Sequence, residues 1–550
     1  MNISKINLLN DLPATVRHLL LVGSVGRRHL ARIAAEVAKS LAVERGSQRA
    51  PLLVPLLSQI LLAAWEEDPL HPGTAEQLWQ WHSRCPFLDE ATASVVRAVC
   101  EESWLPSDSP TNKTSLTGQN PLPNTVQKIH HQVGSTYRTL YWQAIDSGNY
   151  EEARNLMEDA RWPQPLDRLR HRYLASLYWF LGMYARWEEA LIHGGALLSD
   201  ADRCFQLGNL ALIKGERRKA LALWSHCLRQ RPWFTQLILK MYDIAQDLDR
   251  LRQPLKGRVS ICLYTYNKAE ELQHSLKSLA ESQLGSAKIF VLVNGSTDDT
   301  RQVVSTWRDG LGSDRLCAID LPINIGAPAA RNWLMHDPHV NESDWIAYLD
   351  DDALVPPDWL EALGSAVARY PNAGVWGCRV IDAWVPSTIQ AVDYHMLPPS
   401  YAGDIKDAGP FLITMLHYET PDQGQFDYMR PCLHVTGCCH LFSAKTLLES
   451  GDFDLRFSPS QFDDLEHDIR LAFNAKPAIY QGHLAVRHMN KTGKRTRAHP
   501  GERGSAGANL YKLHQKYSKN DYRKLIAWNM GLIEQDIFQK LEEMDRNGIV

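Results

Sequence analysis

Apolar residues recur at helical spacing through the first part of the chain. Residues 29–46, HLARIAAEVAKSLAVERG, place their aliphatic side chains on one helical face, and turn signals such as DPLHPGT separate runs of this kind. This pattern predicts a helical domain over residues 1–106. Residues 107–127 lack apolar periodicity and are rich in Ser, Thr, Asn and Pro, which is typical of a linker.

Two segments between residues 128 and 250 share a sequence pattern. At one constant offset, the matching pairs are Gly148 with Gly215, Ala153 with Ala220, Met157 with Trp224 and Pro165 with Pro232. The offset is about twice the ~34-residue period of tetratricopeptide repeats, which need a glycine at the turn and a small residue where two helices cross. These residues therefore resemble a tetratricopeptide array, and unrelated amphipathic helices are the alternative.

From residue 257 the hydrophobic pattern changes to short β-branched runs that alternate with helical segments. The runs VSICLYTY, KIFVLVN, RLCAIDL and DWIAYLDDD are separated by segments of helix length. Such alternation predicts βαβ units and a mostly parallel sheet, covered by helices on both faces. Ligands bind at the carboxyl ends of the strands in sheets of this kind, so we expect the functional residues to follow each strand.

Polar residues do follow the first two predicted strands. The first strand ends in Thr265, Tyr266 and Asn267, with Glu270 in the next turn, and the second ends at Asn294. Turns between strands and helices also use such residues for structural reasons alone, so these positions by themselves leave both interpretations open.

Three consecutive acids follow the fourth predicted strand, at Asp350, Asp351 and Asp352. Adjacent carboxylates repel one another unless a cation or several donors compensate their charge. Hard oxygen ligands favour Mg²⁺ or Mn²⁺, ions that commonly bridge protein carboxylates and substrate phosphates. The alternative is an acidic helix N-terminus, which explains one aspartate more readily than three.

In combination, several ordered motifs over residues 257–500 resemble the GT-A domain of family 2 glycosyltransferases. The motifs are TYN (265–267), NGSTDDT (294–300), NIGAPAARNWL (324–334), LDDDALVPPDWLE (349–361), VTGCCHLFSAKTLLESGDFDLRF (435–457), FDDLEHDIRL (462–471) and VRH (486–488). The resemblance implies a Rossmann-like fold that transfers a sugar from a nucleotide diphosphate donor, with inversion at the anomeric carbon. The expected fold class is thus a helical, tetratricopeptide-like region followed by an α/β transferase domain.

The resemblance also implies a role for each matching residue. Asp352 and His488 would hold Mn²⁺ or Mg²⁺, and Asp464 would be the general base. Gly437 and Asp463 would lie on the acceptor side. The residues expected to bind the nucleotide sugar are Thr265, Tyr266, Asn267, Glu270, Asn294, Arg331, Asp350 and Asp351. For Asp464 the alternative is a solvated helix N-cap.

Two positions depart from the family pattern. Val293 stands where an acid commonly contacts the base or ribose, which leaves the choice of nucleotide open. Asp463 replaces the usual glutamate before the base and is shorter by one methylene group.

Charge and cysteine content narrow the function classes. The formal net charge is -4, from 59 basic and 63 acidic residues, which argues against general nucleic-acid binding. Ten cysteines without paired spacing, and no apolar run of membrane-spanning length, favour a cytoplasmic protein without a transmembrane segment. A basic stretch at 491–497 is expected to be a loop near the diphosphate or a solvated loop, and residues 501–550 a helical tail.

Three functions remain open at this point. The first is a metal-dependent inverting glycosyltransferase whose helical half docks a protein or peptide acceptor. The second is a transferase of surface polysaccharide or lipid-linked glycan assembly. The third is a scaffold whose repeats bind a partner while the transferase fold is vestigial.

Overall fold

A computed structural model describes residues 5–43, 49–102, 133–162, 164–193, 199–402, 409–489 and 500–549. The linker predicted at 107–127 and the basic stretch 491–497 lie outside these residues. The chain forms two compact units. One unit comprises residues 11–16 and 25–232, and the other comprises residues 1–10, 17–24 and 233–550.

The unit that holds residues 25–232 is helical in its described part, as the apolar spacing predicts. Its helices are α3 (Arg27–Val43), α4 (Ala50–Glu67), α5 (Pro72–Arg84), α6 (Glu90–Glu102), α7 (Val133–Ser147), α8 (Tyr150–Asp159), α9 (Asp167–Phe180), α10 (Tyr184–His193), α11 (Asp200–Ile213) and α12 (Arg217–Gln230). Consecutive helices contact each other from α3 to α6 and from α7 to α12. The assignment to tetratricopeptide repeats remains a prediction.

Helices α11 and α12 show why small residues are needed at their crossing. A Cβ atom on Gly208 would lie 2.2 Å from Nε1 of Trp224. The indole Nε1 donates to the carbonyl oxygen of Phe205 at 3.1 Å, which fixes the ring against the glycine. The buried tryptophan therefore packs directly on the backbone of the neighbouring helix.

The other unit is built on a mixed sheet with the strand order β10-β12-β6-β11-β4-β1-β2-β3. Strands β1 (Val259–Thr265), β2 (Lys288–Asn294), β3 (Leu316–Leu321) and β4 (Trp345–Leu349) are parallel to one another, as predicted. The second half of the sheet contains β6 (Val375–Asp382), β10 (Met429–Cys432), β11 (Cys439–Ser443) and β12 (Ala478–His488). Strand β11 runs antiparallel between β4 and β6.

Two short strands add to this sheet, and two more form a small sheet of their own. Strand β5 (Ala353–Leu354) pairs with the end of β12, and β7 (Ile389–Ala391) pairs with β6. Strands β8 (Met396–Leu397) and β9 (Leu412–Ile413) form a separate small sheet.

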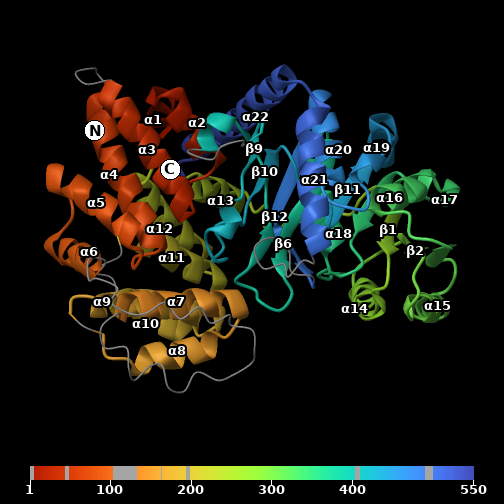
Figure 1. The fold of residues 1–550 in the computed structure, drawn as a ribbon, viewed down its shortest axis with the longest axis horizontal. Coiled ribbons are helices and arrows are strands. Elements are labelled where there is room, and N and C mark those ends of the chain that lie inside the picture. Colours follow the sequence, from red (N-terminus) through yellow and green to blue (C-terminus); the bar gives the residue numbers. More distant parts are fainter. Residues whose placement is uncertain are drawn as a thin grey trace. The chain divides into compact units, whose positions relative to one another are not determined.

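Helices pack on the strands around a core of aliphatic and aromatic side chains. They include α14 (Ala269–Ala280), α15 (Thr300–Leu311), α16 (Ala327–His336), α18 (Trp359–Arg369), α19 (Ala444–Ser450) and α20 (Asp463–Phe473) (Figure 1). Short helical pieces are α17 (Pro338–Asn341), η3 (Pro399–Ala402), η4 (Leu416–Tyr418) and η5 (Leu455–Phe457). Buried Val, Ile and Leu side chains of β1, β2 and β4 form part of this core. Because these strands are parallel, the polar residues that follow them lie at the same edge of the sheet.

Segments from both ends of the sequence belong to the sheet-containing unit. Helices α1 (Lys5–Asp11) and α2 (Ala14–Val22) contribute to it in part, and α13 (Thr235–Ala245) precedes the first strand. The C-terminal tail forms α21 (Pro500–Lys516) and α22 (Lys519–Arg546), and α22 contacts β10. The buried Lys540 of α22 donates to the carbonyl oxygen of Met429 at 2.7 Å.

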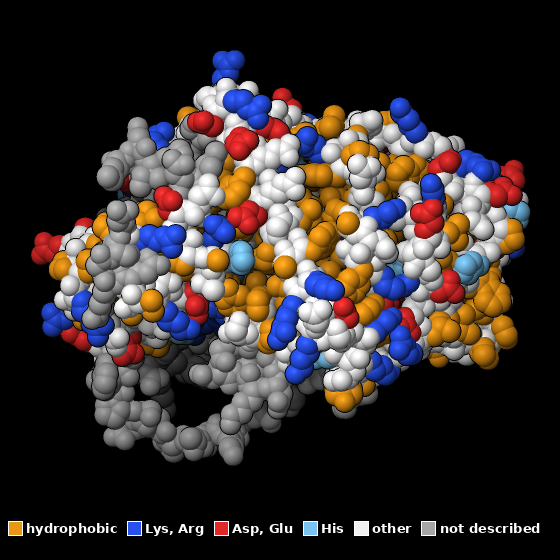
Figure 2. Space-filling view, turned by 90° about the horizontal axis from the view of Figure 1, so that it is seen from above, with side chains coloured by type: hydrophobic (Ala, Val, Ile, Leu, Met, Phe, Trp, Pro, Cys, Tyr) orange, Lys and Arg blue, Asp and Glu red, His pale blue; other side chains and the backbone are white. Residues whose placement is uncertain are grey.

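Acidic and basic side chains are interspersed on the surface that Figure 2 shows, with hydrophobic side chains between them. The ten cysteines, all within the described residues, are free thiols. Among the described helices, none combines the length and apolar content needed to cross a membrane.

Candidate active site

The acids Asp350, Asp351 and Asp352 follow β4 at the carboxyl edge of the sheet, and a lysine compensates part of their charge. Nζ of Lys268 lies 3.1 Å from Oδ1 of Asp351 and 2.7 Å from Oδ2 of Asp352. Oδ1 of Asp352 lies 2.8 Å from Nε2 of His488, and Oδ2 of Asp350 lies 3.8 Å from the same nitrogen. The structure therefore brings the predicted acids and His488 into one cluster.

Strand pairing and one glutamine set the orientation of His488. The backbone of His488 pairs with Ala353, the residue after the acids, because β12 runs alongside β5. Nδ1 of His488 lies 2.8 Å from Oε1 of Gln390. Since a glutamine oxygen only accepts hydrogen bonds, Nδ1 carries the proton, and Nε2 faces the acids with its lone pair when the ring is neutral.

Burial and charge act in opposite directions on the acids. Burial alone would raise the pKa of Asp352, but the contacts with His488 and Lys268 hold that pKa well below its ordinary value. Burial raises the pKa of Asp351 to about 6, and burial together with the Asp352 charge raises the pKa of Asp350. Burial opposes the charge of Lys268, yet the acids raise the pKa of this lysine above its ordinary value.

The donor atoms of this cluster fit a divalent cation. Ligand atoms of Asp350, Cys438 and His488 lie within 4.8 Å of one another. Oδ1 of Asp352 is buried and accepts no hydrogen bond of good geometry from the described residues. Carboxylate oxygens and an imidazole nitrogen suit Mn²⁺ or Mg²⁺. Burial raises the pKa of the Cys438 thiol well above its ordinary value, which agrees with the packing role expected of this cysteine.

A second carboxylate, that of Asp464, lies in the first turn of α20 (Asp463–Phe473) and is accessible to solvent. Its Oδ2 accepts from the backbone N–H of Gly437 and its Oδ1 from that of Leu465, each at 2.8 Å. Its side chain is 19% exposed, against 4% for neighbouring Asp463. A Cβ atom on Gly437 would lie 2.5 Å from Nη2 of Arg331 and 3.0 Å from Oδ2 of Asp464, so a residue without a side chain is required there.

Asp463 pairs with Arg331 of α16 through Nη1 and Oδ2. The guanidinium lies 5.3 Å from the ring centres of both Tyr264 and Phe453, and Tyr348 donates to the carbonyl oxygen of Arg331 at 2.8 Å. Both charged side chains of the pair are buried, and so the pair fixes α16 against the start of α20. This ion pair joins two residues that the sequence motifs assigned to different sides of the site.

His434 lies between two carboxylates, those of Asp468 and Asp464. Nδ1 of His434 is 2.7 Å from Oδ2 of Asp468, and its Nε2 is 4.0 Å from Oδ2 of Asp464. Burial opposes the charge of His434, but the bond to Asp468 and the charge of Asp464 raise its pKa. Burial would raise the pKa of Asp464, whereas the charges of His434 and Arg331 hold it below its ordinary value.

The dipeptide Gly437–Cys438 connects the two parts of the site. The N–H of Gly437 binds Asp464, and the carbonyl oxygen of Cys438 accepts from the N–H of Asp350 at 3.0 Å. On the other side of the acids, the N–H of Met489 donates to the carbonyl oxygen of Asp352 at 3.0 Å. The acidic cluster and Asp464 therefore belong to one continuous backbone framework.

The remaining predicted residues lie at the ends of β1 and β2. Thr265 is buried, Tyr266 is 45% exposed and Glu270 is exposed on the first turn of α14. Asn267 has a left-handed φ of 53° and accepts from the N–H of Thr297 at 2.7 Å. Asn294 donates to Oδ1 of Asn324 and accepts from the N–H of Ile325, so its carboxamide supports the segment before α16.

Sequence reasoning missed Lys268, Gln390 and His434 as parts of this site. Lys268 directly follows the TYN motif. Three adjacent acids need a compensating cation, and this need was the signal that could have identified the lysine. Gln390 and His434 give no such signal, because only the sheet pairing brings them close to His488 and Asp464.

Part of the sheet-containing unit matches a known family model. Residues 260–444, which are fewer than half of the chain, match the model of the family described as Glycosyl transferase family 2. The predicted order of a helical region followed by an α/β domain is confirmed, while the tetratricopeptide assignment stays a prediction. Asp464 and His488 lie beyond the matched residues, so their place in the site rests on the sequence motifs and on the contacts described above.

Individual relatives are distant. A "Glucosyl-dolichyl phosphate glucuronosyltransferase" of Haloferax volcanii is 24% identical over 131 residues, which are 24% of this chain and 40% of the relative. The chain thus spans well under two thirds of that relative.

Solved structures are similarly distant. A structure of GalNAc-T7 with UDP, GalNAc and Mn²⁺ is 12% identical, with a TM-score of 0.38 over 48% of this chain and 50% of the other. A mannosyltransferase from Pyrobaculum calidifontis with GDP-Man and Mn²⁺ is 16% identical, with a TM-score of 0.34 over 59% and 87%.

Proposed function

We propose that the protein is a metal-dependent inverting glycosyltransferase that moves a sugar from a nucleotide diphosphate donor to an acceptor. One observation carries this proposal: Gly437–Cys438 joins an acidic cluster, whose donor atoms fit a cation, to an accessible carboxylate, Asp464. Direct displacement of a nucleotide diphosphate needs both elements, a positive centre for the leaving group and a base for the incoming hydroxyl.

On the donor side, Asp352 and His488 would hold Mn²⁺ or Mg²⁺, with Asp350 next to them. A bound cation supplies positive charge to the leaving diphosphate. Gln390 keeps Nε2 of His488 directed at the acids, and a fixed ring orientation strengthens metal binding. Lys268 adds a positive charge beside the same carboxylates. Thr265, Tyr266, Asn267, Glu270, Asn294, Arg331 and Asp351 would surround the nucleotide sugar.

On the acceptor side, Asp464 would take the proton of the attacking hydroxyl. Its accessible side chain is held by the N–H of Gly437, and the charges of His434 and Arg331 keep it ionised. An ionised carboxylate at a fixed position is what a general base requires. Asp463 would act through Arg331, since its carboxylate is buried in that ion pair.

For the acceptor we propose a protein or peptide docked by the helical unit, in a cytoplasmic enzyme. Stacked helix pairs form extended surfaces that bind peptides, and the helices from α7 to α12 form such a series. The name of the Haloferax volcanii relative includes a dolichyl phosphate, which favours a lipid-linked glycan acceptor as the second candidate.

The donor half of the proposal is tested by nucleoside diphosphate release. Purified protein with Mn²⁺ and a panel of nucleotide sugars is expected to release nucleoside diphosphate from at least one donor. The Asp352→Asn variant is expected to lose this activity. Absence of release from every donor, with equally weak nucleotide binding by both proteins, would instead support a scaffold with a vestigial transferase fold.

The acceptor half is tested with a labelled donor in lysate. Label that migrates with a polypeptide supports the proposed acceptor class. Label found in the lipid fraction alone overturns it in favour of lipid-linked glycan assembly.

A further inference from the structure

The chain enters α20 through a backbone conformation that needs support from outside the segment. Gln461 and Phe462, directly before Asp463 and Asp464, have φ values of 83° and 68°. Residues with a Cβ atom rarely adopt this left-handed region, and they remain in it only where surrounding contacts hold them. The position of Asp464 therefore depends on what holds the preceding residues.

Asn509 of α21 provides that contact. Its Nδ2 donates to three carbonyl oxygens, those of Phe457 at 2.8 Å, Ser460 at 2.9 Å and Gln461 at 3.2 Å. The side chain is 1% exposed, so water does not compete for these bonds. One carboxamide thus fixes the turn from η5 to the first residue with a left-handed φ.

We infer that Asn509 is a positioning residue for Asp464, and that α21 serves as a strap that holds the base in place. This inference rests on the proposed function, because it assigns Asn509 a role in the reaction that Asp464 would perform. Asn509 reaches no other group of the proposed site directly, and acts only through the backbone of residues 457–461.

The segment of residues 457–461 also contacts the start of α16, the helix that carries Arg331, the ion-pair partner of Asp463. The carbonyl oxygen of Pro459 accepts from the N–H of Ala327 at 2.8 Å, at the start of α16, which carries Arg331. The Arg331–Asp463 ion pair then connects α16 back to α20. A shift of the 457–461 segment would therefore move both partners of the pair and the carboxylate of Asp464 beside it.

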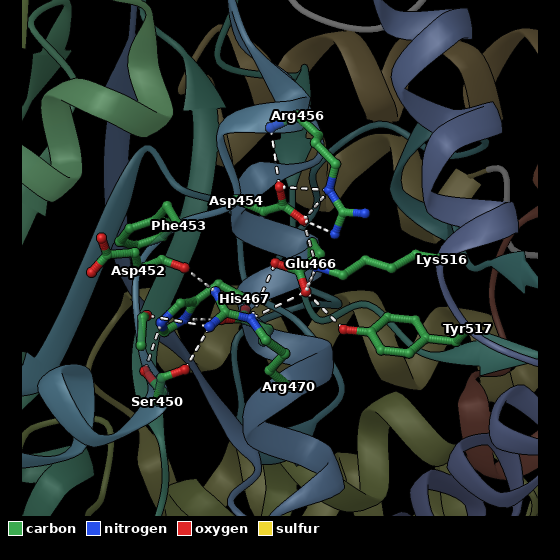
Figure 3. Close-up of polar contacts among 12 residues, drawn as sticks. Ser450, Asp452, Phe453, Asp454, Arg456, Glu466, His467, Arg470, Lys516 and Tyr517 are labelled. Carbon is green, nitrogen blue, oxygen red and sulfur yellow. Dashed lines mark hydrogen bonds and ion pairs between the residues drawn. The ribbon is translucent and has the colours of Figure 1, made fainter.

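The end of helix α21 contacts Asp454 and Glu466, which precede and follow Asp464 in the sequence (Figure 3). Lys516 lies 2.6 Å from Oδ2 of Asp454 and 2.5 Å from Oε1 of Glu466, and Tyr517 donates to Glu466 at 2.7 Å. Lys512 donates to the carbonyl oxygen of Arg456 at 2.7 Å and to Oδ1 of Asn509 at 2.9 Å. Helix α21 therefore contacts the segment that precedes Asp464 and, through Glu466, also contacts α20, the helix that contains Asp464.

The near-isosteric Asn509→Asp variant separates this role from general stability. It replaces the donor by an acceptor that faces three carbonyl oxygens, and we expect kcat for transfer to fall about 10- to 100-fold, since small displacements of a catalytic group have large effects. KM for the donor is expected to change less than kcat, because the acids after β4 and His488 of β12 lie outside the segment that Asn509 holds. Unchanged kcat overturns the inference, as does an equal loss carried by KM alone.

Two further variants keep the test decisive. Asn474→Asp is the matched control, because the exposed carboxamide of Asn474, directly after α20, donates to the carbonyl oxygen of Arg470 at the end of that helix; this variant is expected to retain wild-type kcat and KM. If Asn509→Asp does not fold, Lys512→Met weakens the same strap from the surface and is expected to lower kcat about threefold or more. Wild-type kcat in that variant would contradict the inference.

Hydrogen–deuterium exchange tests the strap without any activity measurement. In Asn509→Asp or Lys512→Met, peptides that cover residues 457–464 are expected to exchange faster, whereas those that cover β1 and β2 are unchanged. Unchanged exchange over 457–464 overturns the inference. If exchange increases but the wild type transfers no sugar, the strap is supported while the proposed function fails.

Discussion

Lys268 donates to Oδ2 of Asp352 at 2.7 Å, and so a protein cation lies against the carboxylate that is proposed to bind a metal ion. The same ammonium lies 3.1 Å from Asp351. An incoming divalent cation must therefore share these carboxylates with a fixed positive charge, which weakens its binding in the absence of a diphosphate.

Replacement of this lysine is expected to strengthen metal binding by the nucleotide-free protein. Lys268→Met removes the repulsion and should tighten Mn²⁺ binding about three- to tenfold. Titration with Mn²⁺, followed by calorimetry or by the EPR signal of the free ion, measures the effect. Lys277→Met, an exposed lysine of helix α14, which follows Lys268, is the control. Equal or weaker binding by Lys268→Met would show that the lysine does not oppose the ion.

His434 is expected to set the acidic limb of the pH profile of kcat/KM. Burial would raise the pKa of Asp464, and the His434 charge acts against this. Because a general base must be deprotonated, activity falls as the pH drops through the pKa of Asp464. His434→Asn keeps a donor for Asp468 but removes the charge that lowers the pKa of Asp464, so the limb should move to higher pH.

The control for this profile is His336→Asn, an exposed histidine that contacts Asp452. It should leave the acidic limb in place. An unmoved limb in His434→Asn would mean that this histidine does not influence the group whose protonation limits the rate.

Helix crossing in the helical unit is expected to depend on Gly208. Gly208→Ala would place Cβ 2.2 Å from Nε1 of Trp224. Overpacking of this kind costs about 1–3 kcal/mol, and each kcal/mol lowers Tm by about 2–4 °C in a domain of this size. Thermal unfolding followed by circular dichroism measures the change. Gly531→Ala, in α22 with open space around it, should not lower Tm. A wild-type Tm in Gly208→Ala would contradict the close packing.

The sequence predicts the framework of the site because strand ends are local features. Asp350, Asp351 and Asp352 follow an apolar run, and His488 ends another, so each was visible without the fold. That β12 brings His488 to within 2.8 Å of Asp352 follows from strand pairing far apart in sequence.

The supporting residues were not predictable from the sequence for a related reason. Gln390 and Asn509 are single amides in unremarkable contexts, and their roles depend on one bond to His488 and on three carbonyl oxygens near Asp464. Asn294 adds a further case. Its position at a strand end predicts a nucleotide contact, which stays a prediction, and only the structure shows that its carboxamide also binds Asn324 and the N–H of Ile325.

Asp464 is proposed to remove the acceptor proton, and the transfer rate of Asp464→Asn measures this role. The asparagine can still accept from Gly437, so the donor site should be preserved and donor affinity should stay within about twofold. We expect transfer to fall by a factor of about 10² to 10⁴, with Asp452→Asn, an exposed carboxylate, as the unaffected control. Full transfer activity in Asp464→Asn would contradict the account.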